Sequence, residues 1–182
     1  MSNETIEQYI AWLRANDACD EAIEWSETRA DFDACWRECQ NPAWLLWLLE
    51  HASVLDDKRA RLFACWCVRY TPLADGRVAW DLLTDERSRT AVEVAERHAV
   101  GEATDGELAA ARTAAGTAAL SAAPDSGAAA ESATWDAWYA AGTAASAAKY
   151  AARIAQCARI REVWPVEEVA AAIAAQPIGH ER

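Results

Sequence analysis

The stretch that most constrains this chain runs from Ala109 to Ala155 and is dominated by alanine. Alanine fills 23 of these 47 positions, and large aliphatic side chains are almost absent from them. Because alanine is the strongest helix former, the stretch is predicted to be helical. A face of methyl groups buries little apolar area per residue, so such helices have to pack closely against bulkier side chains from elsewhere in the chain.

The bulky side chains lie mostly in the first half of the chain. Ten tryptophans occur in 182 residues, and seven of them precede the alanine-rich stretch: Trp12, Trp25, Trp36, Trp44, Trp47, Trp66 and Trp80. Period-two alternation of β-branched residues, which would indicate strands, is absent. The sequence therefore predicts an all-α fold, a single-domain helical bundle of about eight to nine helices with an alanine-rich C-terminal half.

Short polar signals predict where several of these helices begin. They are N-cap or capping-box patterns, in which a side-chain oxygen accepts from a free backbone N–H of the first turn. The signals are Asp31, Asn41 before Pro42, Thr84-Asp85, and Thr104 with Glu107. Gly101 stands where the preceding helix should stop.

The second alanine-rich helix follows a turn signal at Pro124 to Gly127. An unbroken helix from Ala128 to Trp164 would be about 55 Å long, whereas a compact domain of this size is only about 40 Å across. We therefore expect a kink or break near Gly142, where helix propensity is weak.

The net charge of −12 is placed unevenly. Residues 1–57 hold 13 acidic and three basic side chains, whereas residues 58–182 hold 16 and 14. A field of this sign repels nucleic acids and anionic membranes and attracts basic protein surfaces. The acidic stretch is either a solubilising face or a docking surface for a basic partner, formed by Asp17, Asp20, Glu21, Glu24, Glu27, Asp31 and Asp33.

The expected location is the cytoplasm. No apolar run approaches the roughly 18 residues of a membrane span, and the first residues lack the pattern of a signal peptide. Six cysteines in such a chain are typical of free thiols in a reducing compartment.

The cysteines leave two interpretations open. Cys35 and Cys39 are one helical turn apart and could hold two corners of a zinc site, completed from Cys19, Cys65, Cys67, His51 or Cys157. The alternative is that they are core thiols, because free cysteine is among the most buried residue types.

No catalytic motif is present, and no histidine follows a glutamate at the spacing of a di-iron site. The sequence therefore predicts a protein that is not an enzyme and holds no cofactor.

Two basic groups offer an alternative ligand site. Lys58, Arg59, Arg61 and Arg69 form one, and Lys149, Arg153, Arg159 and Arg161 form the other. If they converge beside Trp66, Trp135, Trp138 or Tyr139, they would suit a small anionic, nucleotide-like molecule. Otherwise they are surface cations paired with the nearby carboxylates Asp56, Asp57 and Glu162.

Two segments carry a resemblance to a known family. They are Ala60 to Cys67, with the sequence Ala-Arg-Leu-Phe-Ala-Cys-Trp-Cys, and Leu82 to Arg89, with Leu-Leu-Thr-Asp-Glu-Arg-Ser-Arg. With Ala95-Glu96-Arg97, Gly101 to Thr104 and the alanine-rich tail, they make residues 58–164 resemble the class-five immunity proteins of bacterial polymorphic toxin systems, which have relatives in phages. The resemblance implies a small helical protein that binds and neutralises something, with no catalytic residues to carry over.

These observations combine into one expected organisation. Residues 1–57 are acidic, tryptophan-rich helices that pack on the rest, residues 58–175 are an immunity-protein-like helical domain, and residues 176–182 are a flexible tail.

The expected function is a non-enzymatic inhibitor, of the immunity or phage counter-defence type, that blocks a partner protein through its acidic surface. The alternative is a sponge for a nucleotide-like anion, bound by Arg61, Trp135, Trp138, Tyr139, Lys149, Arg153 and Arg159. Large aromatic side chains on a thin helix also predict a homodimer.

Overall fold

The structure is a computed structural model and describes the backbone of residues 3–73, 75–122 and 146–176. It describes the side chains of residues 6–73, 75–117 and 152–176. Ten helices occur in these ranges, and the only strand-like feature among them is an isolated bridge between Pro72 and Val78. The predicted all-α fold is confirmed. The expected break near Gly142 lies outside the described residues.

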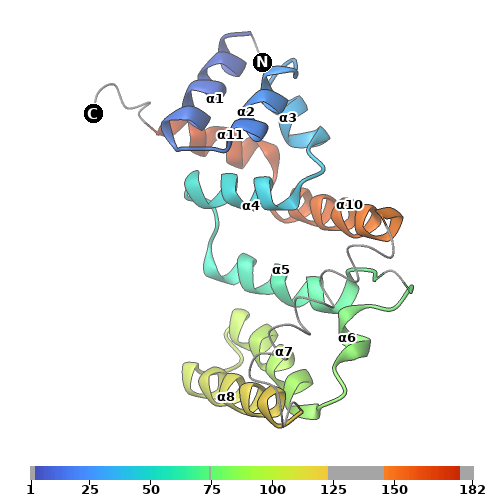
Figure 1. Ribbon diagram of the computed structural model, residues 1–182. Coiled ribbons are helices and arrows are strands. Elements are labelled where there is room, and N and C mark those ends of the chain that lie inside the picture. The colour runs from blue at the N-terminus through green and yellow to red at the C-terminus, as the bar shows by residue number, and fades with distance from the viewer. Residues whose placement is uncertain (1–2, 74, 123–145, 177–182) are drawn as a thin grey trace. The chain divides into compact units, whose positions relative to one another are not determined.

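Figure 1 shows the order of the helices along the chain; residues 123–145, between α8 and α10, lie outside the described ranges. Their bounds are α1 Asn3–Ala15, α2 Asp20–Glu27, α3 Phe32–Glu38, α4 Pro42–His51, α5 Asp57–Tyr70, α6 Ala79–Leu82, α7 Glu86–Ala99, α8 Asp105–Ala122, α10 Ser146–Val163 and α11 Val166–Ala175.

Contacts divide the chain into two compact units. Unit 1 comprises residues 1–56 and 157–182, and unit 2 comprises residues 57–156. The C-terminal residues therefore belong with the N-terminal helices, whereas the sequence-based division grouped them with residues 58–175. By sequence, unit 1 carries 16 acidic and six basic side chains, and unit 2 carries 13 and 11.

The core of unit 1 is aromatic and comes from both ends of the chain. Trp12 of α1 and Leu49 of α4 are 1 % and 0 % exposed. Ile160, Trp164 and Val169, from the C-terminal segment, are each 0 % exposed. Full burial of such large side chains makes them the main apolar contribution to the stability of this unit.

Polar contacts of unit 1 attach the C-terminal segment to the N-terminal helices. The Trp164 indole N–H donates to the Val54 carbonyl at 3.2 Å. The Gln176 side chain accepts from the Trp12 indole N–H at 2.8 Å and donates to the His51 carbonyl at 2.9 Å. These bonds satisfy groups that burial would otherwise leave unpaired.

The predicted helix starts are confirmed by their hydrogen bonds. The Asp31, Asn41 and Asp85 side chains each accept from a backbone N–H of the first turn, at 2.7, 3.1 and 2.8 Å. Thr104 Oγ1 accepts from the Glu107 N–H at 3.2 Å, and the Glu107 carboxylate accepts from the Thr104 N–H at 2.7 Å, which is the capping box. Gly101 follows α7 with a φ of +82°.

Unit 2 buries Phe63 and Cys65 of α5, and it has a separate cluster of smaller side chains between α7 and α8. α7 and α8 lie side by side (Figure 1). The buried cluster between them comprises Val94, Leu108 and Ala111, with Ala91, Ala95 and Ala103 packed against it. Such side chains allow the helices to approach closely but bury little apolar area. Polar contacts between helices therefore contribute more to the stability of this unit.

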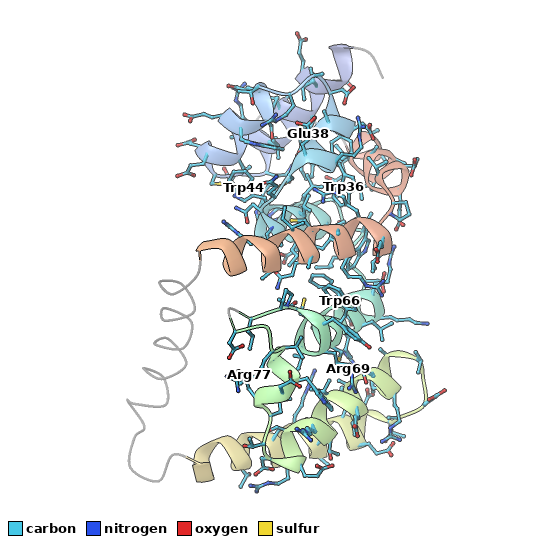
Figure 2. The ribbon with its side chains drawn as sticks, turned by 90° about the vertical axis from the view of Figure 1, so that its right-hand side faces the viewer. Trp36, Glu38, Trp44, Trp66, Arg69 and Arg77 are labelled. Carbon is cyan, nitrogen blue, oxygen red and sulfur yellow. The ribbon has the colours of Figure 1, made fainter. Side chains whose placement is uncertain are left out.

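The principal polar contact of unit 2 joins α5 to α7. Arg69 donates twice to the Glu96 carboxylate, at 2.6 and 2.7 Å, and its guanidinium lies 4.0 Å from the centre of the Trp80 ring (Figure 2 labels Arg69). Both side chains of the pair are less than a third exposed. The planar guanidinium suits both contacts at once, which an ammonium cannot do.

We predict that Trp164→Ala destabilises unit 1 by about 3–5 kcal/mol, because it empties a fully buried site. The measurement is the free energy of opening of the α1 and α4 amides by hydrogen exchange. Glu50→Ala is the control, since Glu50 lies on α4 of the same unit and is exposed; its effect should be much smaller. Equal effects of the two changes would contradict the assigned core.

We predict that Arg69→Lys destabilises unit 2 by about 1–2 kcal/mol. Lysine cannot reproduce the paired hydrogen bonds to the Glu96 carboxylate, and it has no planar group to stack on the Trp80 ring. Arg77→Lys is the matched control: Arg77 pairs with Asp75 at 2.6 Å, but both side chains are about half exposed, and water screens such a pair, so its replacement should cost clearly less than that of Arg69. Urea unfolding followed by circular dichroism compares the two, and an equal loss would remove the special role of Arg69.

Candidate binding site in the N-terminal unit

The first part of the candidate site is an acidic hollow formed by α1, α2 and their connection. Four of the seven predicted acidic residues line it: Asp17, Asp20, Glu24 and Glu27. Arg14 is the single basic residue of the lining, and it pairs with Glu27 at 2.5 Å. Asp20, Glu24 and Glu27 lie one turn apart on the same face of α2, and the structure adds Asp17 from the preceding connection, which leaves the hollow with excess negative charge.

The other three acidic residues lie outside this hollow. Asp31 accepts from the Ala34 N–H as the N-cap of α3, and Asp33 pairs with Arg37 at 2.6 Å. Glu21 is exposed on α2. The predicted acidic set therefore has one converging group of four, while the helix start and the ion pair account for Asp31 and Asp33.

The second part of the site is an apolar cavity enclosed by α1, α2, α3 and α4. Its volume is about 340 Å³. Four tryptophans contribute to its wall: Trp25, Trp36, Trp44 and Trp47 (Figure 2 labels Trp36 and Trp44). None of the described residues that line it is a lysine or an arginine. A partly enclosed apolar space with few polar groups is the usual form of a small-molecule site.

The aromatic rings around the cavity are arranged by contacts between helices. The rings of Trp25 and Trp44 lie 6.0 Å apart at 54°. Tyr9 meets Phe32 edge to face at 4.9 Å. The Arg29 guanidinium lies 4.4 Å from the centre of the Trp25 ring, so this ring already receives a cation from within the unit.

The interior of the cavity disfavours negative charge. Burial is the main cause that raises the pKa of the Tyr9 hydroxyl above its ordinary range, and a hydrogen bond with the Ser26 side chain offsets only part of this. Burial likewise raises the pKa of the Cys35 thiol to about 11. Both groups therefore stay neutral at physiological pH and behave as parts of an apolar wall.

The hollow and the cavity meet at the connection between α1 and α2. Asp17 and Ala18 line both of them. Asp17 adopts a φ of +58°, in the left-handed region that few residues other than glycine, asparagine and aspartate enter readily. Its exposed carboxylate has no ion-pair partner among the described side chains. A carboxylate thus stands at the mouth of an apolar cavity.

The residues of the alternative anion site are only partly described. Trp135, Trp138, Tyr139 and the side chain of Lys149 lie outside the described residues. Arg61 of unit 2 is hydrogen-bonded to His98, and Arg153 of the same unit is exposed. Arg159 belongs to unit 1 and pairs with Glu162 at 3.0 Å. The anion site, like a homodimer based on these aromatic residues, stays a prediction.

The cysteines mostly lie in the cores. Cys35, Cys39, Cys65 and Cys157 are buried, and Cys19 is exposed. The Cys35 thiol donates to the Ser26 carbonyl at 3.8 Å, and the Cys39 thiol donates to the Asn41 carbonyl at 3.5 Å. Within the described ranges, no three His, Cys, Asp or Glu side chains gather in a way that would hold a metal ion. The core-thiol interpretation therefore fits these four positions.

None of the described helices is long and apolar enough to cross a bilayer. No protein-family model matches the chain, and no curated protein or solved structure is significantly similar to it. The resemblance of residues 58–164 to immunity proteins therefore stays a prediction.

Sequence reasoning did not single out the cavity. Its signal was the density of tryptophan between Trp25 and Trp47, which the sequence analysis assigned to the core as a whole. Trp44 and Trp47 are three residues apart on α4, and the helical period alone brings their side chains near each other. That Trp25 and Asp17 face the same space depends on how α2 packs, which no local pattern contains.

We predict that at about pH 8 a disulfide reagent such as dithiobis(nitrobenzoate) modifies Cys19 first, because that thiol is exposed. Cys35, Cys39 and Cys157 should react only on unfolding, since they are buried and since the raised pKa of Cys35 keeps it protonated. Cys19→Ser should remove the fast phase of thiol modification. The phase is measured by stopping the reaction at successive times and analysing the protein by mass spectrometry. Equally fast modification of Cys35 in the native protein would contradict the enclosed cavity wall.

Proposed function

We propose that this chain is a non-enzymatic, immunity-type inhibitor that acts in the cytoplasm by covering a basic surface of a partner protein. The observation that carries the proposal is the convergence of Asp17, Asp20, Glu24 and Glu27 on one hollow with Arg14 as its only cation. Counter-defence by a phage is one role of this kind.

The charge of the whole unit supports the same proposal. Unit 1 has 16 acidic and six basic side chains. Mutual repulsion in such a unit opposes folding, and solubility alone is achieved with charges of mixed sign. A basic partner relieves the repulsion when it binds, and the long-range field speeds the encounter before any contact forms.

The resemblance to immunity proteins agrees with a role in binding rather than in chemistry. The segments that carry it, Ala60 to Cys67 and Leu82 to Arg89, lie in unit 2. In this proposal unit 1 supplies the charged docking surface, and the identity of the partner is found by capture from the native host.

We predict that the double change Asp20→Asn with Glu24→Gln slows association with the captured and purified partner by several-fold to roughly tenfold, because steering acts on the association rate. The matched control is Glu50→Gln with Glu167→Gln, which removes the same charge from exposed positions of unit 1 that do not line the hollow. Surface plasmon resonance measures the rates.

The control pair should stay within about twofold of the unmodified chain, and the difference between the pairs should shrink as salt brings the Debye length below about 8 Å. Circular dichroism checks that both variants keep their helices. If both pairs slow association equally, the effect belongs to net charge and not to the hollow. An association rate independent of salt and of both pairs would overturn the proposal.

A further inference from the structure

The cavity of unit 1 has the size of a small-molecule site. Its volume of about 340 Å³ lies at the lower end of the range of roughly 300–1,000 Å³ that is usual for ligand pockets. A dry cavity of about 150 Å³ is already enough to bind benzene. The space therefore accommodates a bicyclic ring with a short substituent.

The wall of the cavity suits an aromatic ring. Trp25 and Trp44 come from different helices, and both are only half-buried although they border an otherwise apolar space. Their rings are tilted at 54° and leave faces and edges against which another ring can pack. An apolar occupant would remove this surface from water, at about 25 cal/mol per Å² buried.

The mouth of the cavity selects the charge of the occupant. The Asp17 carboxylate stands there without an ion-pair partner among the described side chains, and Asp20 and Glu24 line the adjoining hollow. An anionic ligand would meet like charges at the entrance, and the lining offers no lysine or arginine to answer it. A cation would gain the attraction of Asp17, and also that of the tryptophan ring faces other than the one on Trp25 that Arg29 already occupies.

We propose that this cavity binds a small aromatic amine, with its ring packed against the tryptophan side chains of the wall and its ammonium group beside Asp17. The proposal goes beyond the inhibitor function and does not depend on it, because the occupant is a free small molecule and not a protein surface. It requires no chemistry on the ligand, only reversible binding.

The test uses three probes that share an indole ring and differ in charge: tryptamine, 3-methylindole and indole-3-propionate. Isothermal titration calorimetry on the full chain should give the tightest binding for tryptamine, about five- to tenfold tighter than for neutral 3-methylindole, as expected for one partly exposed ion pair. Indole-3-propionate should bind more weakly than 3-methylindole.

Asp17→Asn isolates the contribution of the charge. Asparagine has nearly the same shape and also tolerates the left-handed backbone at this position. The change should lower tryptamine binding to the level of 3-methylindole and leave 3-methylindole within about twofold. Glu50→Gln is the control, because it removes one charge from unit 1 at a position that does not line the cavity.

Ala22→Leu tests the location, because Ala22 lines the cavity from α2 and a larger side chain would fill it. All three probes should lose at least about tenfold in affinity, with helix content unchanged by circular dichroism. If this variant loses helix content, Ala43→Leu replaces it, since Ala43 is an exposed lining residue of α4.

Three results would overturn the proposal: no binding of tryptamine at millimolar concentration, an order of affinities that ignores charge, or tryptamine binding that survives both Asp17→Asn and the filled cavity. Failure here is distinct from failure of the inhibitor proposal. The latter is judged by the association rate of the Asp20→Asn, Glu24→Gln pair with a protein partner, in which the cavity takes no part.

Discussion

Unit 1 depends on the return of the C-terminal segment to the N-terminal helices. Trp164, Ile160 and Val169 are each 0 % exposed, so they are as central to the core as Trp12 of the first helix. The C-terminal segment is held to the N-terminal helices by the contact of α11 with α3 and by the hydrogen bonds that Trp164 and Gln176 form. The first and last helices of the chain therefore stabilise one another, and neither half of unit 1 has a complete core alone.

The same return also supports one wall of the cavity. Arg161 donates to the Trp36 carbonyl at 2.8 Å and to the Cys39 carbonyl. These carbonyls belong to the C-terminal end of the short helix α3 and to the residue that caps it, where backbone acceptors lack partners within the helix. Because Trp36 and Cys39 line the cavity, the Arg161 guanidinium holds this wall through its backbone.

The cores of the two units contain different kinds of side chain. The core of unit 1 includes the buried indole rings of Trp12, Trp36 and Trp164 among aliphatic side chains, while the α7 and α8 cluster of unit 2 is built from valine, leucine and alanine. Small side chains leave little apolar area to bury, and the Arg69, Glu96 and Trp80 contact compensates with a doubly hydrogen-bonded ion pair stacked on a ring. The charge follows the same division, because unit 1 carries most of the excess acidity.

The sequence by itself determined the helical class, the helix starts and the acidity of the N-terminal part. Asp31, Asn41, Asp85 and Thr104 act locally, within one turn of the residues that they cap, so their roles can be read from short patterns. Charge counts need no structure at all. For Cys35 and Cys39 the sequence left a zinc site and core thiols both open, and their burial is known only from the structure.

Only the tertiary structure decided which distant residues meet. Trp164 and Val54 are 110 positions apart, and no periodic pattern links them. Asp20, Glu24 and Glu27 share a face of α2 by the helical period alone, but the placing of Asp17 at the mouth of a tryptophan-lined cavity follows from how α2 packs against α1 and α4. Local patterns are set by contacts within a few residues of each other, whereas a cavity is set by the fit of side chains between helices, which depends on the whole fold.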